Sequence, residues 1–279
     1  MKLTPFSQPS IIPGFRLTFG FTVFYLLLIV LIPILGLYLK TFELDWAEFQ
    51  RIVTGPRFQA ALRLSFGASL LAAAFNVMIG TVIAWVLVRY EFPGRRIFDA
   101  IVDLPFALPT AVAGIALTAM YSPAGWIGSL LAPYDIRIVY TPVGIWIALV
   151  FIGLPFVVRT IQPVLQDVNR EIEEASATLG ASRAQTIWNV ILPTLVPAIL
   201  TGFALAFARG VGEYGSVIFI AGNLPRQTEI LPLLIVFRLE EFNYAAAAAI
   251  AAVMLTASFL VLLVVNFIQA WSQRRFALD

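Results

Sequence analysis

The stretch L-S-F-G-A-S-L-L-A-A-A-F-N-V-M-I-G-T-V-I-A-W-V-L-V, residues 64–88, contains no charged residue and lies between Arg63 and Arg89. A helix needs roughly 20 apolar residues to cross the ~30 Å hydrocarbon core of a bilayer. The stretch exceeds that length, and it therefore predicts a membrane-spanning helix for which lipid is the solvent.

The rest of the chain repeats this pattern. Hydrophobic residues make up 60% of the sequence and charged residues 12%, and the mean hydropathy is +0.91. A soluble domain is about half apolar and about a quarter charged. Further uncharged runs occupy residues 17–39, 104–134, 138–158, 184–208 and 242–273. We therefore expect an all-α, polytopic membrane protein with one domain over residues 1–279 and six transmembrane helices, at about 17–39, 62–88, 100–121, 138–164, 191–220 and 243–271.

Composition also excludes several classes of function. The sequence has no cysteine and no histidine, which removes disulfides, thiol chemistry and the usual zinc and haem ligands. We expect no metal site and no enzymatic activity, because neither a metal centre nor a nucleophile with a neighbouring base can be assembled. The excess of 18 basic over 16 acidic residues is small, and it fits loops at an anionic membrane surface and no nucleic acid partner.

Lys and Arg residues indicate the orientation. They are more frequent on the side that would hold both termini and the segment between spans four and five, so these parts are expected in the cytoplasm. The first apolar segment exceeds the roughly 7 to 15 residues of a signal-peptide core and has no small-x-small cleavage site. We therefore expect a retained first span.

A polar segment at about residues 166–190 interrupts the apolar runs, and it includes E-E-A-S-A-T-L-G-A-S-R-A-Q-T-I-W-N-V-I-L-P at residues 173–193. Two apolar stripes at helical spacing predict two short helices; the first comprises Val168, Ile172, Ala175 and Leu179, and the second Ala184, Ile187, Trp188 and Ile191. Gly180 lies where a helix C-cap is expected, and Ser182 with Gln185 fits a capping box. Pro193 is expected to open the next span. From the pattern alone, a plain interfacial helix pair remains an alternative.

The spacing within this segment resembles the EAA loop of the membrane subunits of ATP-binding-cassette importers. That pattern reads E-A-A, three residues, G, nine residues, I-x-L-P. It falls here on Glu174, Ala175, Ser176, Gly180, Val190, Leu192 and Pro193. Ser176 and Val190 depart conservatively from the family's Ala and Ile.

The resemblance implies that the two helices are a cytoplasmic coupling helix pair that docks in a groove of an ATPase. The only lysines, Lys2 and Lys40, do not end a phosphate-binding loop, so this chain is expected to bind no cofactor. ATP and Mg would then lie on two partner ATPase subunits. A second, related but different permease subunit, a periplasmic binding protein and membrane lipid are the other expected partners.

The stretch F-A-R-G-V-G-E-Y-G-S-V, residues 207–217, places Arg209 and Glu213 four residues apart at membrane depth in the fifth span. Two interpretations stay open: the pair neutralises itself, or it borders the path or gate of an anion. Three glycines, Gly210, Gly212 and Gly215, would allow close helix approach and bending.

The stretch D-L-P-F-A-L-P-T-A-V-A-G-I, which begins at Asp103, indicates either a proline-kinked helix with an interfacial charge or another part of the path. Both stretches resemble the sulfate/thiosulfate and molybdate permeases. The additional first span is similar to the T-type subunit of the sulfate/thiosulfate importers, so we expect a permease subunit for these anions in a bacterial-type inner membrane. Molybdate or tungstate import is the alternative. An ion-coupled secondary transporter is a further one, although no internal repeat is visible.

Overall fold

The computed structural model describes residues 15–276, apart from the side chains of residues 16, 170 and 271–276, and this part of the chain contains helices and no strands. The predicted cytoplasmic placement of the two termini concerns residues 1–14 and 277–279, which lie outside the described residues. The all-α fold predicted from the sequence is confirmed.

Within residues 15–276, five helical segments are long and apolar enough to cross a membrane, namely Leu17–Thr41, Pro56–Arg89, Pro142–Asp167, Arg183–Val211 and Tyr244–Ala270. The first combines most of α1 (Phe15–Leu26) with a π-helical turn η1 (Leu27–Leu31) and α2 (Ile32–Thr41). The second and third are α4 (Pro56–Arg89) and α9 (Pro142–Asp167). The fourth combines α11 (Arg183–Thr186), the π-helical turn η3 (Ile187–Ile191) and α12 (Leu192–Val211), and the fifth belongs to α15 (Tyr244–Phe276).

The segment predicted as the third span is a broken helix. It consists of α5 (Arg95–Val102), α6 (Leu104–Ala107) and α7 (Thr110–Tyr121). The main break falls at Leu108, which is extended because the ring of Pro109 disfavours helical geometry in the residue before it. The proline kink that the sequence indicates is therefore present, and the part of this segment in the path stays a prediction.

The segment predicted as the fifth span, 191–220, also differs from a single helix. The helix α12 ends at Val211 with Gly212 as its C-cap, and the chain then turns into the short α13 (Val217–Ile220). Three glycines within six residues remove side-chain support for a continuous helix and favour this early end.

The core lies where α4, α9 and α12 pack together. Small residues allow this packing: a Cβ atom at Gly80 of α4 would lie 2.9 Å from Cγ1 of Val157, and one at Gly202 of α12 would lie 3.1 Å from Cα of Val157. Helices approach closely in lipid at small residues, because van der Waals packing there replaces the hydrophobic driving force of water.

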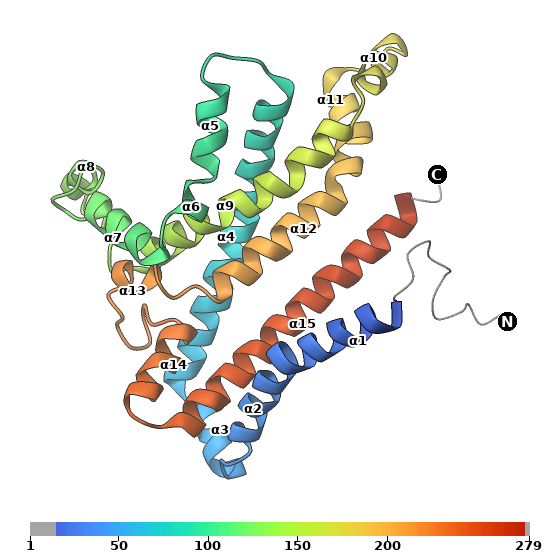
Figure 1. Cartoon of the computed structure of the whole chain (residues 1–279). Helices are drawn as coiled ribbons and strands as arrows, with labels where there is room; N and C mark the ends of the chain where they lie inside the picture. The colour runs from blue at the N-terminus through green and yellow to red at the C-terminus, as the bar shows by residue number, and fades with distance from the viewer. Residues whose placement is uncertain (1–14, 277–279) are drawn as a thin grey trace.

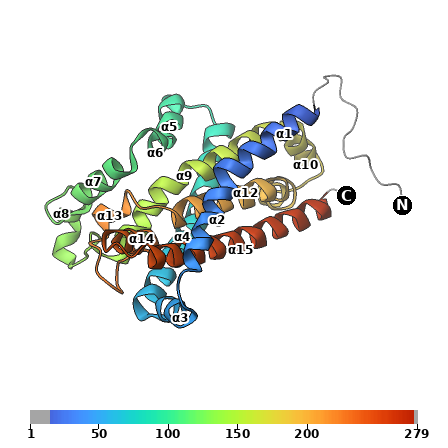
Figure 2. The ribbon, with the colours of Figure 1, turned by 60° about the horizontal axis from the view of Figure 1, so that its bottom comes forward.

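The other helices surround this core. α2 lies beside α15 in both ribbon views (Figures 1 and 2), and the hydroxyl groups of Tyr38 and Thr256 are 2.7 Å apart. The short α3 (Trp46–Thr54) and α14 (Leu231–Glu240) lie at the lower end in Figure 1. The helices α7 and α8 (Gly128–Leu131), with the 3-10 turn η2 (Ala132–Tyr134), project from the opposite side to α15.

Candidate functional site

Two short helices at the upper end of Figure 1 form the predicted polar segment. α10 (Arg170–Thr178) begins at Asn169, whose side chain accepts a hydrogen bond of 3.1 Å from the backbone N–H of Glu171. Gly180 follows with a φ of +83°, and α11 begins with the capping box of Ser182 and Gln185. The hydroxyl groups of Ser176 and Thr186 lie 2.9 Å apart and join the two helices. The predicted helix pair, its glycine bend and its capping box are confirmed.

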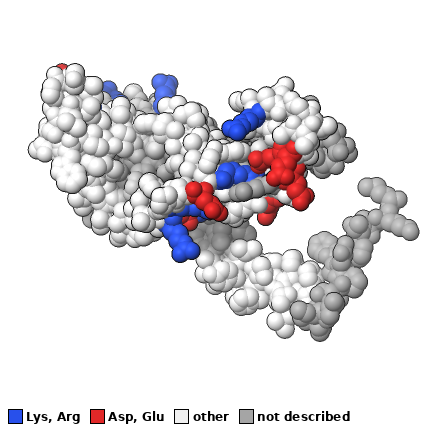
Figure 3. Space-filling view, turned by 90° about the horizontal axis from the view of Figure 1, so that it is seen from above, with Lys and Arg blue, Asp and Glu red and all other residues white. Residues whose placement is uncertain are grey.

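This helix pair presents apolar side chains to the outside. Leu179 is 88% exposed and Trp188 is 67% exposed, beside the exposed carboxylates of Glu171 and Glu174. Figure 3, which views the molecule from this end, shows acidic and basic side chains gathered on a surface that is otherwise almost uncharged. Val168 does not belong to the exposed stripe, because α10 starts after it and Val168 is buried at the end of α9.

The residues of the EAA pattern lie in α10, in the bend after it, in the π-helical turn η3 and at the start of α12. Glu174, Ala175 and Ser176 belong to α10, and Gly180 makes the bend. Val190 lies in the π-helical turn, and Leu192 and Pro193 follow it at the start of α12. Pro193 lies in the first turn of α12, as the sequence predicts, although α11 and the π-helical turn continue the apolar helical segment in front of it. The wider π-helical turn immediately before it interrupts the normal bonding pattern that an internal proline would otherwise disturb.

Arg209 and Glu213 form the expected ion pair, with 2.5 Å between Nη1 and Oε2. They do not share one helical face, because α12 ends at Val211 and Glu213 lies beyond it. The Glu213 side chain is 1% exposed, and its Oε1 accepts hydrogen bonds from the backbone N–H and the hydroxyl of Ser216. The Arg209 side chain is 32% exposed. The carboxylate is therefore fully enclosed, whereas the guanidinium group retains an accessible surface.

The turn after α12 packs tightly against α7. A Cβ atom at Gly215 would lie 2.2 Å from Oγ1 of Thr110, and one at Gly114 would lie 2.4 Å from the backbone oxygen of Ser216. The expected close approach at Gly215 is thus present, and its partner is the broken third segment. Gly212 differs, since a Cβ atom there would meet only the backbone oxygen of Ala208 at 3.8 Å.

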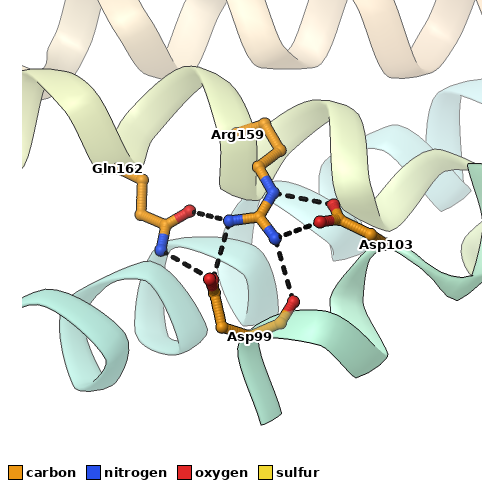
Figure 4. Close-up of polar contacts among 4 residues, drawn as sticks. All are labelled: Asp99, Asp103, Arg159 and Gln162. Carbon is orange, nitrogen blue, oxygen red and sulfur yellow. Dashed lines mark hydrogen bonds and ion pairs between the residues drawn. The ribbon is translucent and has the colours of Figure 1, made fainter. Parts of the chain in front are cut away.

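Asp103, at the break between α5 and α6, belongs to a polar cluster with Arg159, Asp99 and Gln162 (Figure 4). Arg159 on α9 donates from Nε and Nη2 to the two carboxylate oxygens of Asp103, at 2.7 and 2.6 Å. Its Nη1 donates to the side chains of Asp99 and Gln162, at 2.7 and 2.6 Å, and its Nη2 also donates to the backbone oxygen of Asp99 at 2.9 Å. All five N–H groups of a guanidinium group are thereby used. We call these four residues the Arg159 cluster.

The Arg159 cluster also determines the electrostatics of Asp99. Burial raises the pKa of this carboxyl group, but hydrogen bonds from Gln162 and Arg159 and the nearby charges of Arg159 and Arg95 outweigh burial, and the pKa of Asp99 is lowered from its usual value. The cluster therefore favours the ionised carboxylate that holds α5 against α9.

The sequence predicts only part of the Arg159 cluster. Asp103 is a candidate for the path, and the structure shows that its carboxylate is bound by Arg159; its role in the path stays a prediction. Asp99 and Gln162 were not singled out, and Arg159 was considered only for the charge bias. The spacing of Asp99 and Asp103, four residues apart at the end of α5, was the available signal for a shared cation.

A second arginine, Arg89, ends an uncharged run and counts toward the basic residues expected on the cytoplasmic side, but no contact is predicted for it. It is the last residue of α4, and its side chain is 9% exposed. Its Nη2 lies 2.7 Å from Oε1 of Glu173 on α10 and donates to the backbone oxygen of Val168 at 3.2 Å. Within residues 15–276, no group of three or more His, Cys, Asp or Glu side chains could hold a metal ion.

Comparison with known proteins gives the family. The sequence pattern of the binding-protein-dependent transport system inner membrane components matches residues 76–278. The chain belongs to this family. It is thus an integral inner-membrane permease component, and its resemblance to the membrane subunits of ATP-binding-cassette importers is confirmed.

Individual members of this family align with nearly the whole chain. It is 46% identical to the sulfate transport system permease protein CysT of Salmonella typhimurium, over 96% of this chain and 97% of the relative. It is 50% identical to the protein of the same name from Synechococcus elongatus, over 91% of each.

Solved structures show the same fold at low sequence identity. A bacterial ABC transporter involved in the import of the acidic polysaccharide alginate superposes with a TM-score of 0.73 at 18% identity, over 92% of this chain and 96% of that one. The methionine ABC transporter MetNI superposes with a TM-score of 0.61 at 15% identity, over 82% of this chain and 99% of that one.

Proposed function

We propose that the chain is a permease subunit of an ATP-driven importer for sulfate, with thiosulfate as a second substrate. The observation that carries this proposal is its identity of 46–50% with four CysT relatives, which extends over at least 91% of the chain. Dependence on a binding protein, which the family's description states, argues against the ion-coupled secondary transporter that the sequence left open. The chain moves its substrate and leaves hydrolysis of ATP to another subunit.

Uptake measurements test the substrate. Labelled sulfate uptake is measured in a strain that lacks its own sulfate permeases and carries the chain with its partner subunits. Unlabelled thiosulfate should compete, and molybdate or tungstate at equal concentration should compete weakly. Stronger competition by molybdate would favour the alternative substrate class and overturn the proposal of sulfate.

The partners in this proposal are a second permease subunit, two cytoplasmic ATPase subunits and a periplasmic sulfate-binding or thiosulfate-binding protein. The exposed apolar surface of α10 and α11 supports docking of an ATPase, because Leu179 and Trp188 are left uncovered at a polar end of the molecule. Mg and ATP would bind to that partner. A cysteine in place of the exposed Glu174 should form a crosslink to an ATPase subunit, and a crosslink to no ATPase would contradict the docking.

The proposed orientation places α10 and α11 in the cytoplasm together with both chain termini. The chain has no native cysteine, so a single introduced one reports its own position. An impermeant thiol reagent should label Ser182→Cys only from the cytoplasmic side and Thr54→Cys only from outside. The reverse labelling would overturn the orientation.

Arg209 is the candidate for contact with the anion. Its guanidinium group is partly exposed, and among the described residues it makes a single ion pair, with Glu213. Donors therefore remain for a dianion, which a guanidinium group binds through paired hydrogen bonds. The double variant Arg209→Met with Glu213→Gln removes both charges without leaving an unpaired one.

The double variant separates the two interpretations of this pair. If Arg209 serves the path, the variant should reach the membrane and assemble with the ATPase, yet take up sulfate poorly. Near-normal uptake by a well-assembled variant would assign the pair to charge neutralisation alone.

A further inference from the structure

Arg89 joins the coupling helix pair to the core of the membrane domain. α10 is otherwise held by contacts within its own segment, namely the Asn169 cap and the hydrogen bond between Ser176 and Thr186. Among the hydrogen bonds and ion pairs of the described residues, the contact of Arg89 with Glu173 is the one that connects α10 to α4. The two residues are far apart in the sequence, so the contact depends on the fold.

The surroundings of Arg89 connect three elements. The guanidinium group binds α10 through Glu173 and the end of α9 through the Val168 carbonyl oxygen, and it lies 5.8 Å from the ring of Trp85 on its own helix. A groove of about 490 Å³ opens between the end of α4, α10, α11 and η3, and Arg89 and Glu173 are among its lining residues. Because the Arg89 side chain is almost completely buried, water screens its ion pair less than it would screen an exposed pair.

Arg89 makes few polar contacts at this site. Nε of Arg89 is buried and has no acceptor among the described residues, and the nitrogen–oxygen approach to Glu173 is an ion pair without hydrogen-bond geometry. The ion pair alone connects α10 to α4, since the carbonyl contact goes to the end of α9, so α10 can change its angle to α4 while the charges remain close.

We propose that Arg89 is a positioning residue that transmits displacement of α10 and α11 to α4. This inference rests on the proposed docking of an ATPase at α10 and α11. When the ATPase displaces α10, the attraction between Glu173 and Arg89 makes the end of α4 follow. α4 packs along α9 and α12, so its displacement reaches the core of the permease. Without Arg89 the ATPase still docks and hydrolyses ATP, but less of its motion reaches α4.

The complete importer, reconstituted in liposomes with its binding protein, tests this role through the amount of sulfate taken up per ATP hydrolysed. Arg89→Met should lower this ratio about fivefold, as expected when an interaction that couples two sites is removed. Arg96→Met is the matched control, because Arg96 is an exposed arginine at the same end with no ion pair among the described residues. The control should keep the wild-type ratio.

Two further variants keep the test decisive. If Arg89→Met fails to assemble, Glu173→Gln removes the ion pair and leaves Arg89 bound to the Val168 carbonyl, and it should lower the ratio in the same direction. A crosslinker between cysteines that replace Arg89 and Glu173 should restore it. A wild-type ratio in the assembled Arg89→Met or Glu173→Gln variant would overturn the inference.

The crosslink from Glu174→Cys to the ATPase separates this inference from the proposed function. If the crosslink forms in the presence of Arg89→Met and the ratio is unchanged, the docking stands and the role of Arg89 is wrong. If the crosslink fails even with Arg89 present, the docking itself is wrong.

Discussion

Arg159 and Arg89 lie toward the same end of the molecule and bind carboxylates in different ways. Arg159 uses five N–H groups and holds both oxygens of Asp103, whereas Arg89 has one ion pair, one carbonyl contact and a buried Nε without an acceptor among the described residues. Paired hydrogen bonds between a guanidinium group and a carboxylate define the geometry of both partners, whereas a single charge contact leaves rotation free. The same type of side chain therefore fixes α5 to α9 and leaves α10 movable against α4.

The difference agrees with what each contact connects. The Arg159 cluster holds the break of the third segment, where α5 and α6 lack the support of a continuous helix. The Arg89 contact connects the core to the helix pair that has uncovered apolar side chains. Four predictions test whether the first contact serves stability and the second serves motion.

Removal of the Arg159 side chain should have the largest effect. Arg159→Met leaves Asp99 and Asp103 without their cation, and it should lower the free energy of unfolding by about 3 kcal/mol, since hydrogen bonds to charged groups are worth about 1.5–3 kcal/mol each and partial exposure reduces the sum. Membrane abundance and thermal unfolding in detergent are the measurements. Arg159→Lys should recover part of the loss. A stability loss no greater than that of Arg89→Met would remove the distinction between the two arginines.

A double-mutant cycle on Arg89 and Glu173 should give a smaller coupling energy, about 1 kcal/mol, because one partly buried ion pair is broken. The same cycle on Arg159 and Asp103 is the reference and should give at least twice that value. Both are measured by thermal unfolding of the purified permease. Equal coupling energies would show that the number of hydrogen bonds does not distinguish the two sites.

Gly180→Val tests the bend on the movable side. A Cβ atom there would have no described atom within 4 Å, so the φ of +83° is what disfavours a side chain. A bulky L-residue in this region costs about 1–2 kcal/mol, which should shift α10 relative to α11. Membrane insertion should stay normal while copurification of the ATPase falls. Normal copurification together with normal uptake would show that the bend is dispensable.

Acid should have the smallest effect, and it should act through Asp99. The pKa of this carboxyl group is lowered below its usual 3.8 in the folded protein. The stabilisation is therefore present above that usual value and is lost as the pH falls through the lower pKa of the folded state. The difference in unfolding temperature between the wild type and Asp99→Asn should stay constant from about pH 7 to 5 and shrink only below about pH 4. A difference that shrinks near pH 6 would mean that the pKa is raised.

The sequence predicts the local features of this fold well. Lengths of uncharged sequence identify the five long helices, and the capping box of Ser182 and Gln185 follows from residues three positions apart. These features depend on neighbours along the chain, which the sequence displays directly. The division into one domain and the anion contacts stay predictions.

Features that depend on contacts between residues far apart in the sequence could not be predicted from local patterns. Asp99 and Arg159 are separated by 60 positions, and no local pattern relates them. The turn after α12 packs on α7 at Gly215 and Thr110, and this contact joins segments that are far apart in the sequence. No contact is predicted for Arg89, because its partners lie beyond two intervening membrane segments.

The helical segment from Arg183 to Val211 is long enough to transmit motion between its two ends. Its 29 residues, at ~1.5 Å each, span about 40 Å. The exposed Trp188 lies near one end and Arg209 near the other. If this segment tilts by about 5° around one end, the other end moves by about 4 Å, comparable to the rise of a few helical residues. A small tilt caused by a docked partner therefore displaces the Arg209 guanidinium group by more than the diameter of an oxygen atom.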